Sequence, residues 1–213
     1  MKKILLAMIG MISFVQSSYS QNENQHKSGF GFKGGLNLSN VHTQKNTPLP
    51  FEKDSEKKLG LHAGIFAEIF VNEDRKIAIQ PEIVYSEDGY VVKDFNYKDK
   101  SGELEYTLNT INLPILFKYY FTKNFNVFVG PQAVYQICSK YDFKGNEIEI
   151  EDAGYSRRIT STNLDVVSGL ELSTVVGLSI NARYIHGTHT MYKQRDNLDI
   201  TRRGFQIGIG YKF

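Results

Sequence analysis

Six charged residues lie in stretches where apolar residues occupy every second position, and each of the six falls on the other, polar parity. Their chemistry is the first feature of this chain. They are Glu68, Glu82, Lys118, Asp165, Glu171 and Arg183. Buried charges must be paired or hydrogen-bonded, because an isolated buried charge is very costly to desolvate. Acids and bases on neighbouring strands can pair, so we predict an ion network in the interior of the protein. The alternative is a polar path along which ions or small solutes pass.

Alternation of apolar and polar residues surrounds these charges. In "GLHAGIFAEIF" the apolar residues from Leu61 to Ile69 share one parity, and His62 and Glu68 share the other. Such alternation is typical of β-strands. We predict eight strands, at residues 29–39, 59–71, 76–92, 105–120, 125–139, 163–172, 177–187 and 204–213.

The connections between these strands alternate between short and long. "NEDR", "FTKN" and "STVV" are short, and the long polar connections are expected at 40–58, 87–104, 140–162 and 188–203. Transmembrane barrels have short periplasmic turns and longer outer loops. We therefore predict an all-β fold, an eight-stranded antiparallel up-and-down transmembrane β-barrel, with both termini on the periplasmic side.

A water-soluble barrel would also alternate, but it would place its apolar face inside. The glycines of the polar face suit a narrow interior, and the tyrosines and phenylalanines near strand ends suit membrane-interface girdles. These two features favour the membrane arrangement.

The first residues have the pattern of a secretory signal peptide. "MKKILLAMIGMISFVQSSYS" has two lysines, an apolar run and small residues near its end. We predict a signal peptide at 1–20, a mature chain from Gln21, a short segment at 21–28 and a barrel at 29–213. Removing two lysines lowers Lys+Arg from 25 to 23, which equals the 23 acidic residues. This balance gives no support to nucleic-acid binding.

Several segments together resemble a known family. They are "GFKGGLNLSN", "GLHAGIFAEIF", "IAIQPEIVYSEDG", "INLPILFKYYF", "FNVFVGPQAVY" and "FQIGIGYKF". They are similar to the porin-like outer-membrane β-barrel family common in Bacteroidota, small barrels of the OmpA/OmpX kind. The resemblance implies residence in the outer membrane, among its lipids. It also implies that the last strand, through Tyr211 and Phe213, resembles the signal read by the barrel-assembly machinery.

Three prolines fall within predicted strands, at Pro81, Pro114 and Pro131. Proline removes a hydrogen-bond donor from the ladder between strands. We expect bulges or local ladder breaks at these positions.

The remaining motifs indicate neither a cofactor nor a metal. His186 and His189 lack a third ligand nearby in the sequence. The acidic run "NEIEIEDAG" lacks the glycine and spacing of a calcium loop, and its alternation predicts a hairpin beyond the membrane. Neither a nucleophile elbow nor a phosphate-binding loop is present.

These observations predict a non-enzymatic barrel whose long loops meet an extracellular or envelope partner that the sequence does not identify. A narrow pore is the alternative. A lipid-modifying enzyme is a third reading, for which the rim offers only the scattered His42, His186, His189 and Ser156.

Overall fold

The computed structural model describes residues 28–44, 55–97, 100–145, 148–150, 162–188 and 199–213. The predicted signal peptide and all of the short segment except Ser28 lie outside the described residues. The strands are β1 (Gly29–Gln44), β2 (Ser55–Phe70), β3 (Ile77–Tyr97), β4 (Lys100–Thr122), β5 (Phe125–Gly145), β6 (Ile148–Ile150), β7 (Thr162–Ser173), β8 (Leu178–Gly187) and β9 (Asp199–Lys212). The described residues include no helix with the length and apolar character that crossing a membrane requires.

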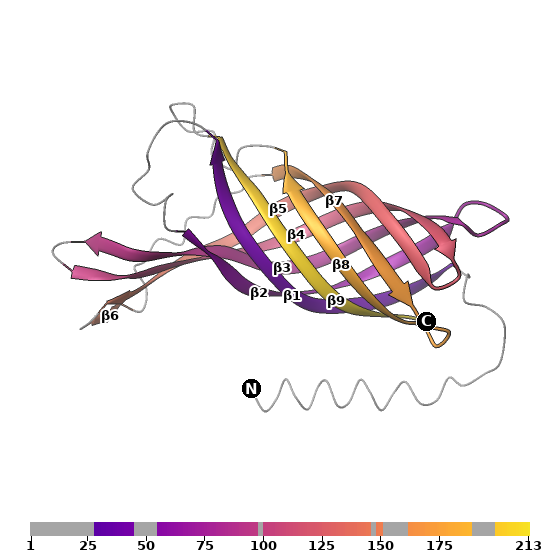
Figure 1. Ribbon diagram of the computed structural model, residues 1–213, viewed down its shortest axis with the longest axis horizontal. Coiled ribbons are helices and arrows are strands. Elements are labelled where there is room, and N and C mark those ends of the chain that lie inside the picture. Colours follow the sequence, from indigo (N-terminus) through magenta and orange to yellow (C-terminus); the bar gives the residue numbers. More distant parts are fainter. Residues whose placement is uncertain (1–27, 45–54, 98–99, 146–147, 151–161, 189–198) are drawn as a thin grey trace.

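Eight of these strands close into one antiparallel barrel (Figure 1). Each strand pairs with its neighbours in the order β4-β3-β2-β1-β9-β8-β7-β5, and pairing of β4 with β5 closes the ring. Among the described residues, strand β6 pairs with the outer end of β5. The predicted eight-stranded up-and-down barrel is confirmed.

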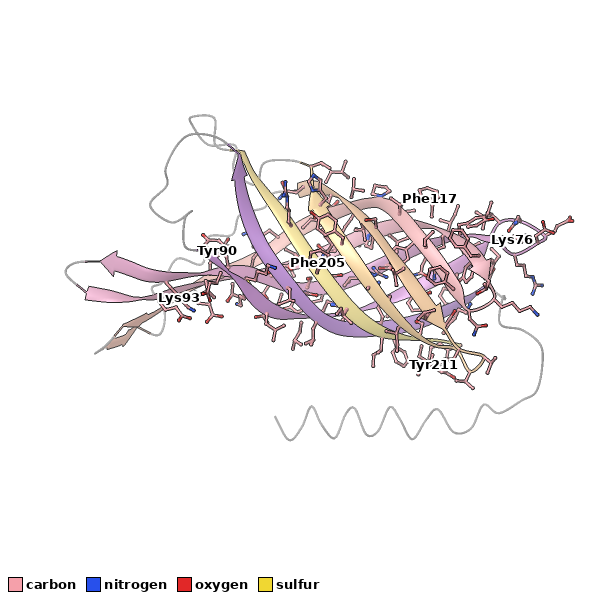
Figure 2. The ribbon with its side chains drawn as sticks, viewed as in Figure 1. Lys76, Tyr90, Lys93, Phe117, Phe205 and Tyr211 are labelled. Atoms are coloured by element: carbon pink, nitrogen blue, oxygen red, sulfur yellow. The ribbon has the colours of Figure 1, made fainter. Side chains whose placement is uncertain are left out.

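The wall of the barrel is apolar outside and polar inside. Large apolar side chains are exposed along every barrel strand, with Ile207 at 63% and Phe30 at 74% exposure. Figure 2 shows Phe117 on this outer surface. Lysines, carboxylates and amides alternate with them and are buried. This arrangement is the opposite of a water-soluble barrel, so the apolar-interior alternative is wrong.

Short turns join the strands at the end of the barrel that carries Phe213 (Figure 1). The turn between β2 and β3 is stabilised by Asn72, whose side-chain oxygen accepts hydrogen bonds from the backbone of Lys76 and Ile77 at 3.0 and 2.9 Å. The turn between β7 and β8 uses Gly177 at φ 85°, a conformation that favours glycine. The predicted short connections are thus tight turns.

At the other end, four strands continue beyond the barrel rim. The stretch predicted as a long loop at 87–104 is mostly strand, because β3 runs to Tyr97 and β4 begins at Lys100. The Tyr90 and Tyr106 rings lie 5.1 Å apart across this hairpin. Cross-strand aromatic pairs stabilise strands, and they extend the ladder past the membrane here.

We call this extension the outer ribbon, and it consists of residues 55–58, 88–97, 100–107, 139–145 and 148–150. It extends to the left of the barrel in Figure 1, and Figure 2 places Tyr90 and Lys93 on it. Strand β6 pairs with Phe143–Gly145 of β5, so the acidic run does extend a hairpin, as its alternation predicts. The loop predicted at 140–162 therefore begins with strand residues.

The three prolines interrupt the ladders without shifting the register. Pairing of β2 with β3 stops after Phe66↔Glu82 and resumes at Ile69↔Ile79, on either side of Pro81. Similar gaps flank Pro114 between β3 and β4, and Pro131 between β4 and β5. Because proline has no N–H, the expected ladder breaks occur, and the register shifts lie elsewhere.

Two glycines face an aromatic ring inside the barrel, Gly31 against Phe66 and Gly169 against Phe128. A Cβ added at Gly169 would lie 2.6 Å from the Phe128 ring and 2.3 Å from the Ala182 carbonyl oxygen. At Gly204, on β9, the nearest atom would be 3.5 Å away.

We therefore expect Gly169→Ala to lower the free energy of unfolding by about 1–3 kcal/mol, the usual cost of overpacking. Gly204→Ala is the matched control and should change it by less. Urea unfolding followed by gel mobility of unheated samples measures both, and equal stabilities would contradict the steric reading of Gly169.

Candidate functional site in the barrel interior

Glu82 and Arg183 join opposite walls of the barrel. Three strands separate β3 from β8 in either direction around the ring. Arg183 donates from both terminal nitrogens to the two Glu82 oxygens, each at 2.8 Å. Lys33, from β1, also pairs with Glu82. The pair is therefore a bidentate strut across the full lumen, the strongest ion-pair geometry available to arginine.

A second cluster is built around Lys118. Its Nζ lies 2.8 Å from Glu68 Oε1 and 2.5 Å from Glu171 Oε1. Lys212 pairs with Glu68, and the Tyr120 hydroxyl donates to the same carboxylate. These side chains come from β2, β4, β7 and β9, which are alternate strands of the ring. Barrel interiors stack side chains from alternate strands in layers, and this cluster is one such layer.

Gln80 connects the two clusters. Its amide nitrogen donates to Glu82 Oε1 at 2.6 Å, and its oxygen accepts a hydrogen bond from Lys118 Nζ at 2.9 Å. Arg183 and Glu171 thus belong to one continuous hydrogen-bonded network.

The structure brings together five of the six charged residues that the sequence singles out. Asp165, the sixth, is buried at another level of β7, where Gln132 Nε2 donates to it at 3.4 Å. We did not expect Gln80 and Tyr120 as linking residues, because neither carries a charge. Gln80 and Tyr120 share the inward parity of Glu82 and Lys118, and this shared parity is the sequence signal that could have identified them.

A third polar group lies nearer the outer rim. His62 Nδ1 lies 2.6 Å from Asn37 Oδ1, and Asn37 Nδ2 donates to Ser86 Oγ at 2.7 Å. Ser86 in turn donates to Asp88 at 3.1 Å. Hydrogen-bonded groups therefore fill the lumen at several levels. The described residues contain no group of three metal-ligating side chains close enough to hold an ion.

A small apolar cluster occupies one side of the same interior. Leu116, Phe128, Val167 and Ile185 pack together and are buried. Arg183 lies over the Phe128 ring, 5.1 Å from its centroid. The guanidinium is therefore held by a cation–π contact as well as by Glu82.

Buried polar atoms without a hydrogen-bond partner in the described interior include His62 Nε2, Asn112 Oδ1 and Asn126 Oδ1. Buried polar groups nearly always find a protein or water partner. These atoms are therefore natural positions for bound water within the lumen.

The last strand ends in a cluster of aromatic side chains. The Tyr211 and Phe213 rings lie 5.3 Å apart, and Phe32 lies 5.9 and 5.8 Å from them. Figure 2 places Tyr211 near the end of the barrel that carries the C-terminus. Aromatic girdles occupy this position at membrane interfaces.

Comparison with family models decides the classification. Residues 19–213 match the model described as "Outer membrane protein beta-barrel domain". The chain belongs to this family. Membership places the protein in the outer membrane, where the exposed apolar belt meets lipid.

Solved structures of low sequence identity share the fold. Ail, the attachment invasion locus protein of Yersinia pestis, crystallised with the heparin analogue sucrose octasulfate, is 12% identical with a TM-score of 0.50. The match covers 88% of this chain and 99% of that one. Neisserial surface protein A is 12% identical with a TM-score of 0.51, covering 87% and 98%. A comparison of the sequence with curated proteins finds no significant match. Assignment to the Bacteroidota form of the family stays a prediction.

Proposed function

We propose that this protein is a non-enzymatic, non-conducting outer-membrane barrel that presents the outer ribbon to an extracellular or envelope partner. The strut between Arg183 and Glu82 is the observation that supports a barrel without conductance. It crosses the middle of the ring, and an eight-stranded barrel is only wide enough for side chains to fill it. Ion pairs that close the lumen serve architecture rather than transport.

The outer ribbon supports the second half. It carries exposed charges, including the Lys93–Glu56 pair at 2.7 Å, in which both side chains are more than half exposed. Exposed ion pairs stabilise little, so we assign these charges to recognition of a partner rather than to stability.

We also propose how the chain reaches the outer membrane. A signal peptide at 1–20 would deliver the chain, with Gln21 as its first mature residue. The strand ending in Tyr211 and Phe213 would then be recognised by the barrel-assembly machinery.

A narrow pore is the second candidate function. The unpartnered atoms of His62, Asn112 and Asn126 favour it, because they call for water in the lumen. Liposome swelling separates the two functions. We expect proteoliposomes to swell in small sugars no faster than protein-free liposomes, and faster swelling would favour the pore.

Orientation can be tested with epitope tags. A tag in "KDKSG", at the tip of the outer ribbon, should react with antibody on whole cells, because long loops face outward in such barrels. A tag in "NEDR", at the opposite end near Lys76, should react only after the cells are opened (Figure 2). Labelling of the second tag on intact cells would mean that the barrel is inverted.

A further inference from the structure

The outward-facing side chains of β8 and β9 change from aliphatic to aromatic to cationic along the barrel axis. One row of cross-strand partners is aliphatic and runs through Ala182, Ile207 and Leu36. The next row toward the outer rim pairs Tyr184 with Phe205, whose rings lie 4.9 Å apart. Figure 2 labels Phe205 on β9. The row after that pairs His186 with Arg203. All three rows have the outward parity of their strands.

This order matches the depth profile of an outer leaflet. Aliphatic side chains face acyl chains, aromatic side chains sit at the interface, and cations meet headgroups. Eight residues separate Tyr211 from Arg203, which is about 26 Å along a strand and about 20 Å along the axis of a tilted one. Arg203 therefore lies at the edge of the apolar belt opposite the Tyr211 girdle.

Unlike Lys33, Lys118 and Arg183 in the lumen, Arg203 has no carboxylate partner among the described residues. Its Nε is buried without a hydrogen bond, and the described residues provide no ion pair for its guanidinium. Its cross-strand neighbours are His186 and Asn40, so neither can neutralise it with a carboxylate. By contrast, Lys58 on the other side of the rim lies 3.0 Å from Glu105 and 3.4 Å from Glu87.

Cross-strand partners carry their Cβ atoms about 5 Å apart, so His186 and Arg203 can reach one anion together. The His186 ring stacks on Tyr184, with 6.3 Å between centroids, which holds it beside the strand. Arginine forms bidentate hydrogen bonds to phosphate, and imidazole supplies a further donor. A phosphate at the leaflet surface is the group that fits this height, charge and donor set.

We propose that Arg203 and His186, with Tyr184 and Phe205 below them, bind the phosphate headgroup of an outer-leaflet lipid. The acyl chains of this lipid lie against the aliphatic row of β8, β9 and β1. This lipid site goes beyond the proposed function and depends only on the orientation of the barrel. It would fix the rotation of the barrel relative to its lipids.

Native mass spectrometry of the full chain in detergent tests this site, with bis-phosphorylated lipid A as the probe. The Arg203→Ala variant should bind this lipid A about tenfold or more weakly than wild type, because it loses charge-assisted hydrogen bonds. His186→Ala should weaken binding less than Arg203→Ala does. The affinity of Arg203→Lys should lie between those of wild type and Arg203→Ala. The control is Lys76→Ala, which removes an exposed cation at the opposite end of the barrel and should bind as wild type does (Figure 2).

Two further arms identify the source of the phosphate. Dephosphorylated lipid A should bind weakly and equally to wild type and all variants. Inorganic phosphate should not displace bound lipid A, and full displacement would show a free-anion site instead. Equal affinity of Arg203→Ala and Lys76→Ala for bis-phosphorylated lipid A would overturn the proposal. Unheated gel mobility verifies folding, and if Arg203→Ala does not fold, Arg203→Lys and His186→Ala decide the question.

Discussion

Replacing Lys118 by alanine should lower the free energy of unfolding more than replacing Ile115 by alanine. Lys118 is 3% exposed, and its loss leaves Glu68 and Glu171 without the cation that lies between them. Removing one partner of a buried ion pair typically costs about 3–5 kcal/mol. Ile115 is 47% exposed on the outer face, where lipid fills the space that its side chain leaves.

Urea unfolding in lipid vesicles measures this difference. The chain has no tryptophan, so tyrosine fluorescence and the mobility of unheated samples are suitable signals. Lys93→Ala is the matched control, because its exposed ion pair with Glu56 should contribute only about 0–1 kcal/mol. A Lys118→Ala variant as stable as the control would mean that lumen water replaces the lysine, and that the network does not hold the barrel together.

Removing the strut should open the lumen. The triple variant Lys33→Ala, Glu82→Ala and Arg183→Ala deletes the side chains that meet at the centre of the ring. The apolar cluster around Phe128 fills one side of the interior, so water and ions should pass on the other side, and stepwise conductance should appear in planar bilayers where the wild type is silent. Gln80 would still hydrogen-bond to Lys118, so the second cluster remains in place.

The double variant Glu56→Ala and Lys93→Ala is the control for this experiment, since it removes charges of the outer ribbon and leaves the interior intact. Arg183→Ala alone serves if the triple variant does not fold. A folded triple variant that stays silent would show that another level, such as the one around His62 and Asn37, closes the lumen.

Much of this fold was predictable from alternation. The parity of Leu61 and Glu68 separates the lipid face from the lumen, and short turns such as "NEDR" determine which strands pair. Alternation does not give the depth at which residues meet across the lumen. Glu82 and Arg183 are 101 positions apart, and a two-residue shift at any ladder between them would change partners without changing faces.

Other features were predicted only in part. The sequence predicts a loop at 87–104, which forms one part of the outer ribbon, because the polar composition of this stretch conceals strands that Tyr90 and Tyr106 stabilise across the hairpin. We do not select Gln80 from the sequence, because it is uncharged. Its amide nevertheless bridges the two clusters, since it donates to the carboxylate of Glu82 and accepts from the ammonium of Lys118. The prolines were expected to break ladders, and the unchanged register around Pro114 follows because neighbouring residues keep their partners.

Single-channel recording of the wild-type protein in planar bilayers is the decisive test of whether the lumen is closed. Folding is verified first by the mobility of unheated samples, so that silence cannot arise from unfolded protein. With Arg183 and Glu82 joined across the lumen, we expect a baseline without discrete current steps at any applied voltage. Reproducible steps of fixed size from the folded wild type, retained in Lys93→Ala and altered in Arg183→Ala, would contradict this expectation and establish a hydrated path through the barrel.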